Sequence, residues 1–261
     1  MKLPIYQVDA FTTRRFRGNP AAVVLLDEWL PDDVLAAIAA ENNVSETAFV
    51  VSRGDAMPLR WFTPQVEVDL CGHATLATAH VLFRYFFPTA QRLTFSTRSG
   101  DLPVTREGEL LTLDFPARPA QPLEISEALV AALGARPQEA HLARDLLAVF
   151  ESQSQIADFQ PDFQRLATLD VFAVLISAPG DTADYVYRFF APRKGIPEDP
   201  VTGSANCTLV PYWAARLGKT ELSAQQLSPR GGELRCTLRG DRVLIAGRTV
   251  EYLRGEITVD I

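Results

Sequence analysis

The sequence predicts an α+β fold made of two pseudo-symmetric halves, each a barrel-like β-sheet wrapped around a central helix. The first observation is an internal repeat. Arg60–Pro64 (RWFTP) returns as Arg188–Pro192 (RFFAP) at an offset of 128 residues, and Gly100 before a strand returns as Gly232 at an offset of 132 residues. The second observation is that each copy contains a helical segment that is apolar on nearly every side. Such a helix must be surrounded by protein, and predicted strands flank each one in the sequence.

The elements of the first half follow from hydrophobic periodicity and turn residues. Strands are expected at Ile5–Asp9, Ala21–Leu26, Ser45–Ser52 and Leu59–Thr63. Arg17–Pro20 is a turn-forming segment between the first two strands. A helix is expected at Val34–Asn42, opened by Pro31. The apolar helix of this half is expected at Thr75–Phe87 and ends before Pro88.

The second half repeats this pattern with a mostly apolar helix at Asn206–Leu217. The proline-containing segment Pro116–Pro137 is interpreted as the connection between the halves, with a short helix at Ser126–Leu133. We therefore expect an N-terminal domain at residues 1–118 and a C-terminal domain at residues 119–261, with the terminal strand able to pack on the first domain.

Composition limits the class of protein. Apolar residues make up 47% of the 261 residues and charged residues 22%, which is typical of a soluble globular protein. The net charge of −7 opposes binding to nucleic acid or to an anionic membrane, and no apolar segment approaches the length of a membrane span. Three cysteines without a close pair predict neither a disulfide framework nor a zinc site, so a reducing cytoplasm is the expected compartment.

Small residues gather at the start of both apolar helices. We call Asp69–Thr75 the first glycine turn and Asp199–Asn206 the second glycine turn. Glycine lets the backbone approach a ligand closely, and the free N–H groups of a helix start favour an anion. Two such turns would form a cradle for a substrate carboxylate in a cleft between the halves. The alternative is that both are tight turns packed with small residues; their repetition in register favours a ligand site.

Three polar residues, two at these turns and one beside the strand pair near the N-terminus, are candidates for the site. His73 lies in the first turn of a helix, where the helix dipole disfavours imidazolium, so a neutral ring is expected. Asp199 is suited to bind a substrate amine or hydroxyl, and its alternative role is to cap the following helix or to complement the charge of its dipole. Asn19 is a further candidate, although its plain interpretation is a turn residue.

Glu46 is unusual because of its strand position. Strict alternation places it on the same face as Val44, Ala48 and Val50. Burying an unpaired carboxylate is costly and raises its pKa, and a carboxyl tuned toward neutrality suits general acid–base catalysis. The alternatives are that this face is exposed to solvent or that Glu46 pairs with an arginine.

Five ordered segments together resemble the phenazine biosynthesis PhzF-like family. They span nearly the whole chain and are Gly18–Val23 (GNPAAV), Asn43–Phe49 (NVSETAF), Arg60–Pro64, Asp69–Thr75 (DLCGHAT) and Asp199–Ala205 (DPVTGSA). The resemblance implies a fold like that of diaminopimelate epimerase, often assembled as a homodimer. It also implies isomerase chemistry with no cofactor and no metal.

The resemblance also implies roles for individual residues. In the phenazine enzyme a glutamate moves a proton along a dihydroaromatic amino acid, and Glu46 matches that glutamate. The family's substrate-holding histidine and aspartate match His73 and Asp199. Its small-residue turns match Gly72 and Gly203–Ser204.

The sequence departs from the two-thiol pattern that related epimerases and racemases of this fold need. The first glycine turn has Cys71, but Thr202 stands at the equivalent place in the second. A threonine hydroxyl is far too weak an acid to replace a thiol. Cys207 lies five residues further on, beyond the first helical turn. Two-base racemisation is therefore disfavoured, and Cys71 has the alternative role of a small buried apolar residue.

Three functions follow as hypotheses. The leading one is a cofactor-independent isomerase that moves a proton within a small carboxylate-bearing metabolite, with Glu46 as general acid and base. The others are a two-base racemase or epimerase of the same fold, and a non-catalytic metabolite-binding or interaction protein. The expected partners are the small molecule and a second copy of the chain, with no nucleic acid and no membrane.

Overall fold

The chain folds into two compact units, described by a computed structural model over residues 1–51 and 57–260. The first unit is formed by Met1–Asp114 together with Ala246–Ile261, and the second by Phe115–Ile245. Of the helices described, none combines the length and the apolar character needed to cross a membrane.

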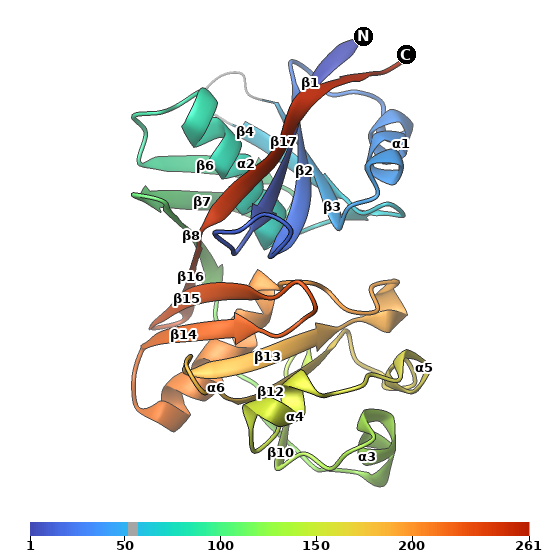
Figure 1. Ribbon diagram of the computed structural model, residues 1–261, viewed down its shortest axis with the longest axis vertical. Helices are drawn as coiled ribbons and strands as arrows, with labels where there is room; N and C mark the ends of the chain where they lie inside the picture. The colour runs from blue at the N-terminus through green and yellow to red at the C-terminus, as the bar shows by residue number, and fades with distance from the viewer. Residues whose placement is uncertain (52–56, 261) are drawn as a thin grey trace. The chain divides into compact units, whose positions relative to one another are not determined.

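The C-terminal end of the chain returns to the first unit. The sequence predicts one boundary between residues 118 and 119, whereas the structure divides the chain after Asp114 and again before Ala246. Strand pairing joins this C-terminal segment to the first unit. β17 (Thr249–Thr258) runs antiparallel along the whole of β1 (Lys2–Ala10) (Figure 1).

The first unit is built on a sheet that continues from β1. Its other strands are β2 (Asn19–Leu26), β3 (Glu46–Val51), β4 (Met57–Phe62), β5 (Glu67–Val68), β6 (Arg92–Thr97), β7 (Gly100–Glu107) and β8 (Leu110–Pro116). Neighbours pair in the order β17–β1–β2–β3–β4–β6–β7–β8, and β5 pairs with β4. The pairs β2–β3 and β4–β6 are parallel, and the others are antiparallel. The predicted strands are confirmed with small shifts of their ends, except that Ser52 lies outside the described residues.

The second unit has the same pattern of pairing. Its strands are β9 (Gln121–Leu123), β10 (Glu139–Leu142), β11 (Leu146–Val149), β12 (Val174–Pro179), β13 (Tyr185–Phe190), β14 (Glu221–Gln226) and β15 (Gly232–Arg239). β16 (Arg242–Gly247) begins in this unit and crosses the boundary before Ala246. The strands pair from β9 to β15 in chain order, and β11–β12 and β13–β14 are parallel. This is the same succession of parallel and antiparallel pairs as from β17 to β7, so the sequence repeat is a repeat of topology.

Each unit has one central helix, as predicted. α2 (Gly72–Tyr85) buries eleven of its 14 residues and packs against β1, β2 and β3. The predicted start at Thr75 is three residues late, because Cys71 is the extended residue before the helix and its carbonyl already accepts from Thr75 N at 3.2 Å. The first glycine turn therefore contains the start of α2.

The second central helix, α6 (Asn206–Leu217), has the predicted bounds and follows a 3₁₀ turn, η2 (Gly203–Ala205). Pro211 lies inside it and has no N–H to donate to the carbonyl of Cys207. That carbonyl accepts instead from Arg118 N at 2.7 Å, so the interruption is satisfied from outside the helix.

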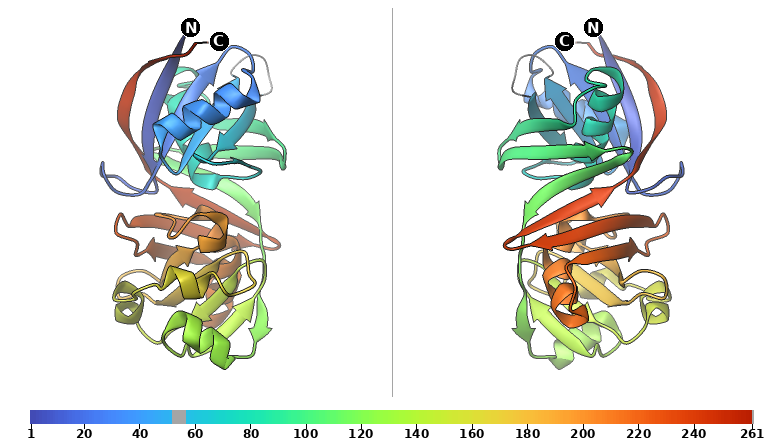
Figure 2. Two further views of the ribbon diagram at one scale, coloured as in Figure 1. Left: turned by 90° about the vertical axis from the view of Figure 1, so that its right-hand side faces the viewer. Right: turned by 90° about the vertical axis from the view of Figure 1, so that its left-hand side faces the viewer.

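Smaller helices cover the sheets. α1 (Asp32–Asn42) lies across the outside of the first-unit strands (Figure 2) and buries Leu35 and Ile38 in a cluster with Phe49. In the second unit, α3 (Glu127–Leu133) starts at Ser126, whose hydroxyl accepts from Leu129 N. The remaining short helices are α4 (Gln153–Ala157), α5 (Phe163–Leu166) and η1 (Pro192–Lys194).

The interpretation of Pro116–Pro137 as a connection between domains is wrong. Leu129 and Leu133, on α3, belong to the hydrophobic core of the second unit together with Val174 and Phe190. Buried leucines at this spacing place one face of the helix in a core, so the segment is part of the second unit.

Candidate active site

Glu46 and His73 form a buried pair in the first unit. Glu46 is the first residue of β3 and His73 the second residue of α2. Glu46 Oε2 lies 2.9 Å from His73 Nε2, and the two side chains are 11% and 6% exposed. The open question from the sequence is thereby answered: Glu46 is neither solvent-exposed nor paired with an arginine. Packing of α2 on β2 and β3 positions the pair.

Asn19 holds the other side of the imidazole. It is the first residue of β2 and fully buried, and its Nδ2 lies 3.2 Å from His73 Nδ1. An amide N–H can only donate, so in this orientation His73 Nδ1 is the acceptor. The ring proton then sits on Nε2, the nitrogen that lies 2.9 Å from Glu46 Oε2, although the N–H is not aligned with that oxygen. Asn19 is thus brought into the site that the sequence proposed for it, and it does more than form a turn.

The pKa of His73 moves in the opposite direction from the sequence expectation. Burial by itself lowers this pKa, but the contacts with Cys71 and Glu46 outweigh burial and hold it well above the usual range. The expectation of a neutral ring considered only the helix dipole, whereas the carboxylate of Glu46 is in direct contact. A protonated ring has N–H groups on both sides and needs Asn19 to turn its amide oxygen toward Nδ1.

Cys71 completes this cluster. Its Sγ lies 3.5 Å from His73 Nδ1, and burial, reinforced by the charge of Glu46, raises the pKa of the thiol to about 11. Cys71 is therefore a thiol rather than a thiolate near neutral pH. Glu46, Cys71 and His73 each offer a ligand atom, all within 4.8 Å of one another, and such a set suits a zinc-like cation. A search for cysteine pairs misses this set because it contains only one cysteine.

The second glycine turn is organised around Asp199 in the second unit. The hydroxyl of Thr202 donates to Asp199 Oδ2. Gln226 ties the two residues together, because its Oε1 accepts from Thr202 N and its Nε2 donates to Asp199 O, both at 2.6 Å. The residue directly before α6 is Ala205 and the residue before η2 is Thr202, whose hydroxyl contacts Asp199. The alternative role of Asp199, as a cap or charge complement of the helix start, stays a prediction.

The glycines of both turns do not have the positive φ angle that favours glycine. Neither Gly72 nor Gly203 is among the glycines with positive φ in the described chain. Gly72 opens α2 and Gly203 opens η2, and both are buried, whereas Ser204 is half-buried. The absence of a Cβ at each helix start leaves the backbone N–H groups approachable.

Asn206 is a site residue that the sequence analysis missed. Its Nδ2 donates to the carbonyls of Thr202 and Gly203 at 3.3 and 3.1 Å. Its Oδ1 accepts from the hydroxyl of Tyr185 at 2.6 Å, and Tyr187 donates to Thr202 O at 3.1 Å. This buried network fixes the backbone of the second glycine turn. The sequence did offer one sign of it, because Asn206 is a polar residue in an otherwise apolar helix. The residues around it do not indicate which groups it would bind.

Comparison with known proteins identifies relatives along nearly the whole chain. The family model described as phenazine biosynthesis-like protein matches residues 8–255. An uncharacterized isomerase of Pseudomonas aeruginosa is 52% identical over 257 residues, covering 98% of this chain and 99% of that protein. A crystal structure of a phenazine biosynthesis protein of the PhzF family from Enterococcus faecalis superposes with a TM-score of 0.97 at 48% identity, covering 99% and 100% of the two chains.

A more distant structure shares the fold alone. The hydroxyproline epimerase of Agrobacterium vitis superposes with a TM-score of 0.64 at 11% identity, covering 100% of this chain and 93% of that chain. The fold expected from the sequence, two units with a central helix each, is thus confirmed both within the chain and by its structural neighbours.

Proposed function

The chain belongs to the phenazine biosynthesis-like family, and on this premise we propose that it is a cofactor-independent isomerase that moves a proton within a small carboxylate-bearing metabolite. The observation that carries the proposal is the buried contact of 2.9 Å between Glu46 and His73. A buried carboxylate in contact with an imidazole is suited to proton transfer.

Glu46 acts as the general base and then as the general acid. Its Oε2 has no well-aligned hydrogen bond among the described residues, so a lone pair is available for a substrate proton. A substrate C–H bond breaks, its electron pair enters the substrate's π system, and the proton moves to Glu46. Glu46 then gives the proton to a different carbon and returns to its starting state. The result is an isomer, with no net oxidation or reduction.

His73 and the two glycine turns hold the substrate. His73, with its raised pKa, is suited to donate a hydrogen bond to an oxygen that gains negative charge during the transfer. The backbone N–H groups at Gly72–His73 in the first unit are proposed to bind an oxygen of the substrate, and those at Gly203–Ser204 in the second unit are a separate proposed binding group. Asp199 orients an amine or hydroxyl of the substrate, and Asn19 holds the ring of His73.

Solvent-deuterium incorporation tests the proposal. Wild type, Glu46→Gln and Glu41→Gln are incubated in D₂O with a cell metabolite extract, and labelled species are found by mass spectrometry. Glu41 is exposed on α1 five residues from Glu46, so the same change there is a matched control. We expect a metabolite labelled by wild type and by Glu41→Gln but not by Glu46→Gln. Equal labelling by Glu46→Gln would refute the assignment. A ligand that co-purifies without ever being labelled would favour a non-catalytic binding protein.

A two-base racemase or epimerase is the second candidate. It needs a thiol at each glycine turn, but Thr202 occupies the second turn, and its hydroxyl donates to Asp199. Cys71, with a pKa of about 11, lacks a thiol partner there. Racemisation of an amino acid by wild type that disappears in Cys71→Ser would favour this candidate over the isomerase.

The assembly and the compartment belong to the same proposal. We propose a homodimer working in a reducing compartment, on the basis of the family resemblance and the three free cysteines. Sedimentation equilibrium of the full chain tests the dimer, and a single species of 28.8 kDa would contradict it.

A further inference from the structure

A second pocket lies in the first unit, away from the Glu46–His73 pair. It has a volume of about 440 Å³ and is lined by charged residues from four segments: the loop after β1, the C-terminal part of α2, the hairpin of β7 and β8, and the start of β17. The charged lining residues are Arg15, Arg84, Arg106, Arg248, Glu109 and Glu251. A volume of this size suits a small metabolite.

The pocket is positively charged, whereas the chain as a whole is negatively charged. Four guanidinium groups line it against two carboxylates, although the protein carries a net charge of −7. One carboxylate is already engaged, because Glu251 accepts from the hydroxyl of Tyr85 at 2.9 and 3.1 Å. The other, Glu109, is 88% exposed and lies 3.7 Å from Arg248 Nε, a distance typical of a weak surface pair.

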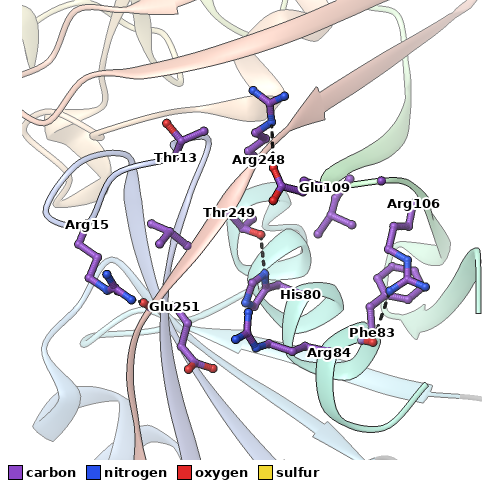
Figure 3. Close-up of a pocket in the computed structure, with 13 residues that line it drawn as sticks. Thr13, Arg15, His80, Phe83, Arg84, Arg106, Glu109, Arg248, Thr249 and Glu251 are labelled. Carbon is purple, nitrogen blue, oxygen red and sulfur yellow. Dashed lines mark hydrogen bonds and ion pairs between the residues drawn. The ribbon is translucent and has the colours of Figure 1, made fainter. Parts of the chain in front are cut away.

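Three of the guanidinium groups have donors left for a ligand. Arg84 has no carboxylate partner among the described residues, and Arg15 uses only its Nε, which donates to Glu251 O at 2.9 Å. In Figure 3, Arg84 lies next to His80 and Arg15 reaches toward Glu251, whereas the guanidinium group of Arg248 lies beside Glu109 and is directed away from His80. Arg106 differs, since it donates to the carbonyls of Phe83, Pro88 and Ala90. Its guanidinium group therefore stabilises the backbone that lines the pocket.

We propose that this pocket binds a small polyanion with two or more carboxylate or phosphate groups, and that its occupancy is transmitted to His73. Guanidinium groups bind both kinds of oxyanion through paired N–H groups. Three of them on different segments suit a ligand with more than one anionic group. The pocket is distinct from the proposed catalytic site, so the proposal does not rest on the identity of the substrate.

The route to His73 is a short one through the sheet and the helix. Thr249 Oγ1 lies 2.8 Å from His80 Nδ1, at the pocket. Thr249 pairs across the sheet with Ala10, and Ala10 pairs with Asn19, which contacts His73.

His73 and His80 are two turns apart on one face of α2. Thr249, Ala10 and Asn19 are neighbours on three adjacent strands. The first contacts His80 and the last contacts His73, so this row of the sheet contacts both histidines of the helix face. A ligand that moves Thr249 or His80 acts on both ends of this row.

Calorimetric titration of the full chain tests binding. The probes are citrate, which carries only carboxylates, and inorganic pyrophosphate, which carries only phosphates, at constant ionic strength set with chloride; acetate is the monoanion control. We expect saturable binding of at least one polyanion, weakened at least about tenfold in Arg84→Gln/Arg248→Gln and unchanged in Arg92→Gln. Arg92 is exposed on β6 and does not line the pocket.

Several results would overturn the binding site. They are no saturation by either polyanion up to about 10 mM, equal affinity in the double variant, or equal weakening in Arg92→Gln, which would indicate unspecific attraction. Should the double variant fail to fold, Thr13→Glu places a carboxylate at the exposed edge of the pocket and must weaken binding by the same reasoning.

Histidine NMR tests the transmission. The chain has three histidines, so the ring signals of His73, His80 and His141 are separable. We expect a saturating polyanion to shift His80 and His73, and to leave His141, in the second unit, unchanged. Binding that shifts His80 alone would keep the pocket and overturn the transmission.

Discussion

Arg60 and Arg188 make the same contacts in the two units. Arg60 pairs with Glu67 and Arg188 with Glu198, each through Nε–Oε1 at 2.7 Å and Nη2–Oε2 at 2.9 Å. Each guanidinium also lies over the ring two residues along its strand, at 5.1 Å for Phe62 and 5.2 Å for Phe190. Both pairs tie the strand before a glycine turn to the segment that leads into it, so they are positioning residues for the two turns.

The pair in the second unit is expected to be the more important for stability. Arg188 and Glu198 are 8% and 13% exposed, and Arg188 also donates to Phe159 O at 2.6 Å. Removing one partner leaves the other charge buried, which costs about 3–5 kcal/mol. We expect Arg188→Gln to lower the free energy of unfolding by about that amount in urea, with only partial rescue by Arg188→Lys because a lysine cannot form the double contact.

An exposed pair provides the control for this measurement. Arg136 and Glu127 are 58% and 88% exposed, so Arg136→Gln is expected to change the free energy of unfolding by less than about 1 kcal/mol. Equal losses in Arg188→Gln and Arg136→Gln would contradict a structural role for the pair of the second unit.

The raised pKa of His73 predicts a pH dependence of stability. Its pKa in the folded chain lies above the value of about 6.5 of an unfolded chain. The stabilisation is therefore fully present below about pH 6.5 and is lost as the pH rises through the folded-state pKa. In Glu46→Gln the carboxylate charge that supports the raised pKa is gone. We expect the stability difference between wild type and Glu46→Gln to decline above about pH 6.5, measured by urea unfolding across the pH range; a pH-independent difference would contradict the pair.

Local patterns predicted the elements, and long-range pairing decided the rest. The bounds of α6 and the glycine-led starts of β7 and β15 follow from residues close in sequence. The sequence analysis allows the terminal strand to pack on the first domain, but the pairing of β17 with β1 does not follow from local residues, because the two strands lie at opposite ends of the chain and an exposed strand carries little apolar signal. A domain boundary therefore could not be predicted from composition near residue 118.

The same division applies to the site. Glu46 stood out because a carboxylate interrupts an apolar strand face, and His73 because it starts a helix. Their contact, and hence the pKa direction of His73, joins residues from different elements and has no local signal. The carboxylates paired with the repeated arginines were also missed, since Glu67 and Glu198 lie seven and ten residues after their partners and break the repeat.

Burial predicts that none of the three cysteines reacts in the folded chain. Burial raises the pKa of Cys71 and Cys207 to about 11 and that of Cys236 to about 12. At pH 8 the thiolate fraction of each is on the order of one in a thousand or less. We expect no thiol labelling by an aromatic disulfide reagent in buffer and three labelled thiols per chain in urea, counted by mass spectrometry. Rapid labelling of Cys71 in the folded chain would contradict its state as a buried thiol.

The pKa of His80 reports on the charge of the polyanion pocket. Burial lowers this pKa, and the positive charge of Arg84, one turn along α2, lowers it further, while Glu251 acts in the opposite direction. Removing the guanidinium in Arg84→Gln takes away one of the two lowering causes, so we expect the pKa of His80 to rise, followed by the ring proton shift in an NMR titration. Arg92→Gln, a change of the same kind on β6, is expected to leave the pKa of His80 unchanged. A polyanion bound beside Arg84 must act like the Arg84→Gln variant, because it neutralises the same charge. If Arg84→Gln leaves the pKa of His80 unchanged, Arg84 does not point its charge into the pocket, and the arrangement of guanidinium groups on which the polyanion site depends is wrong.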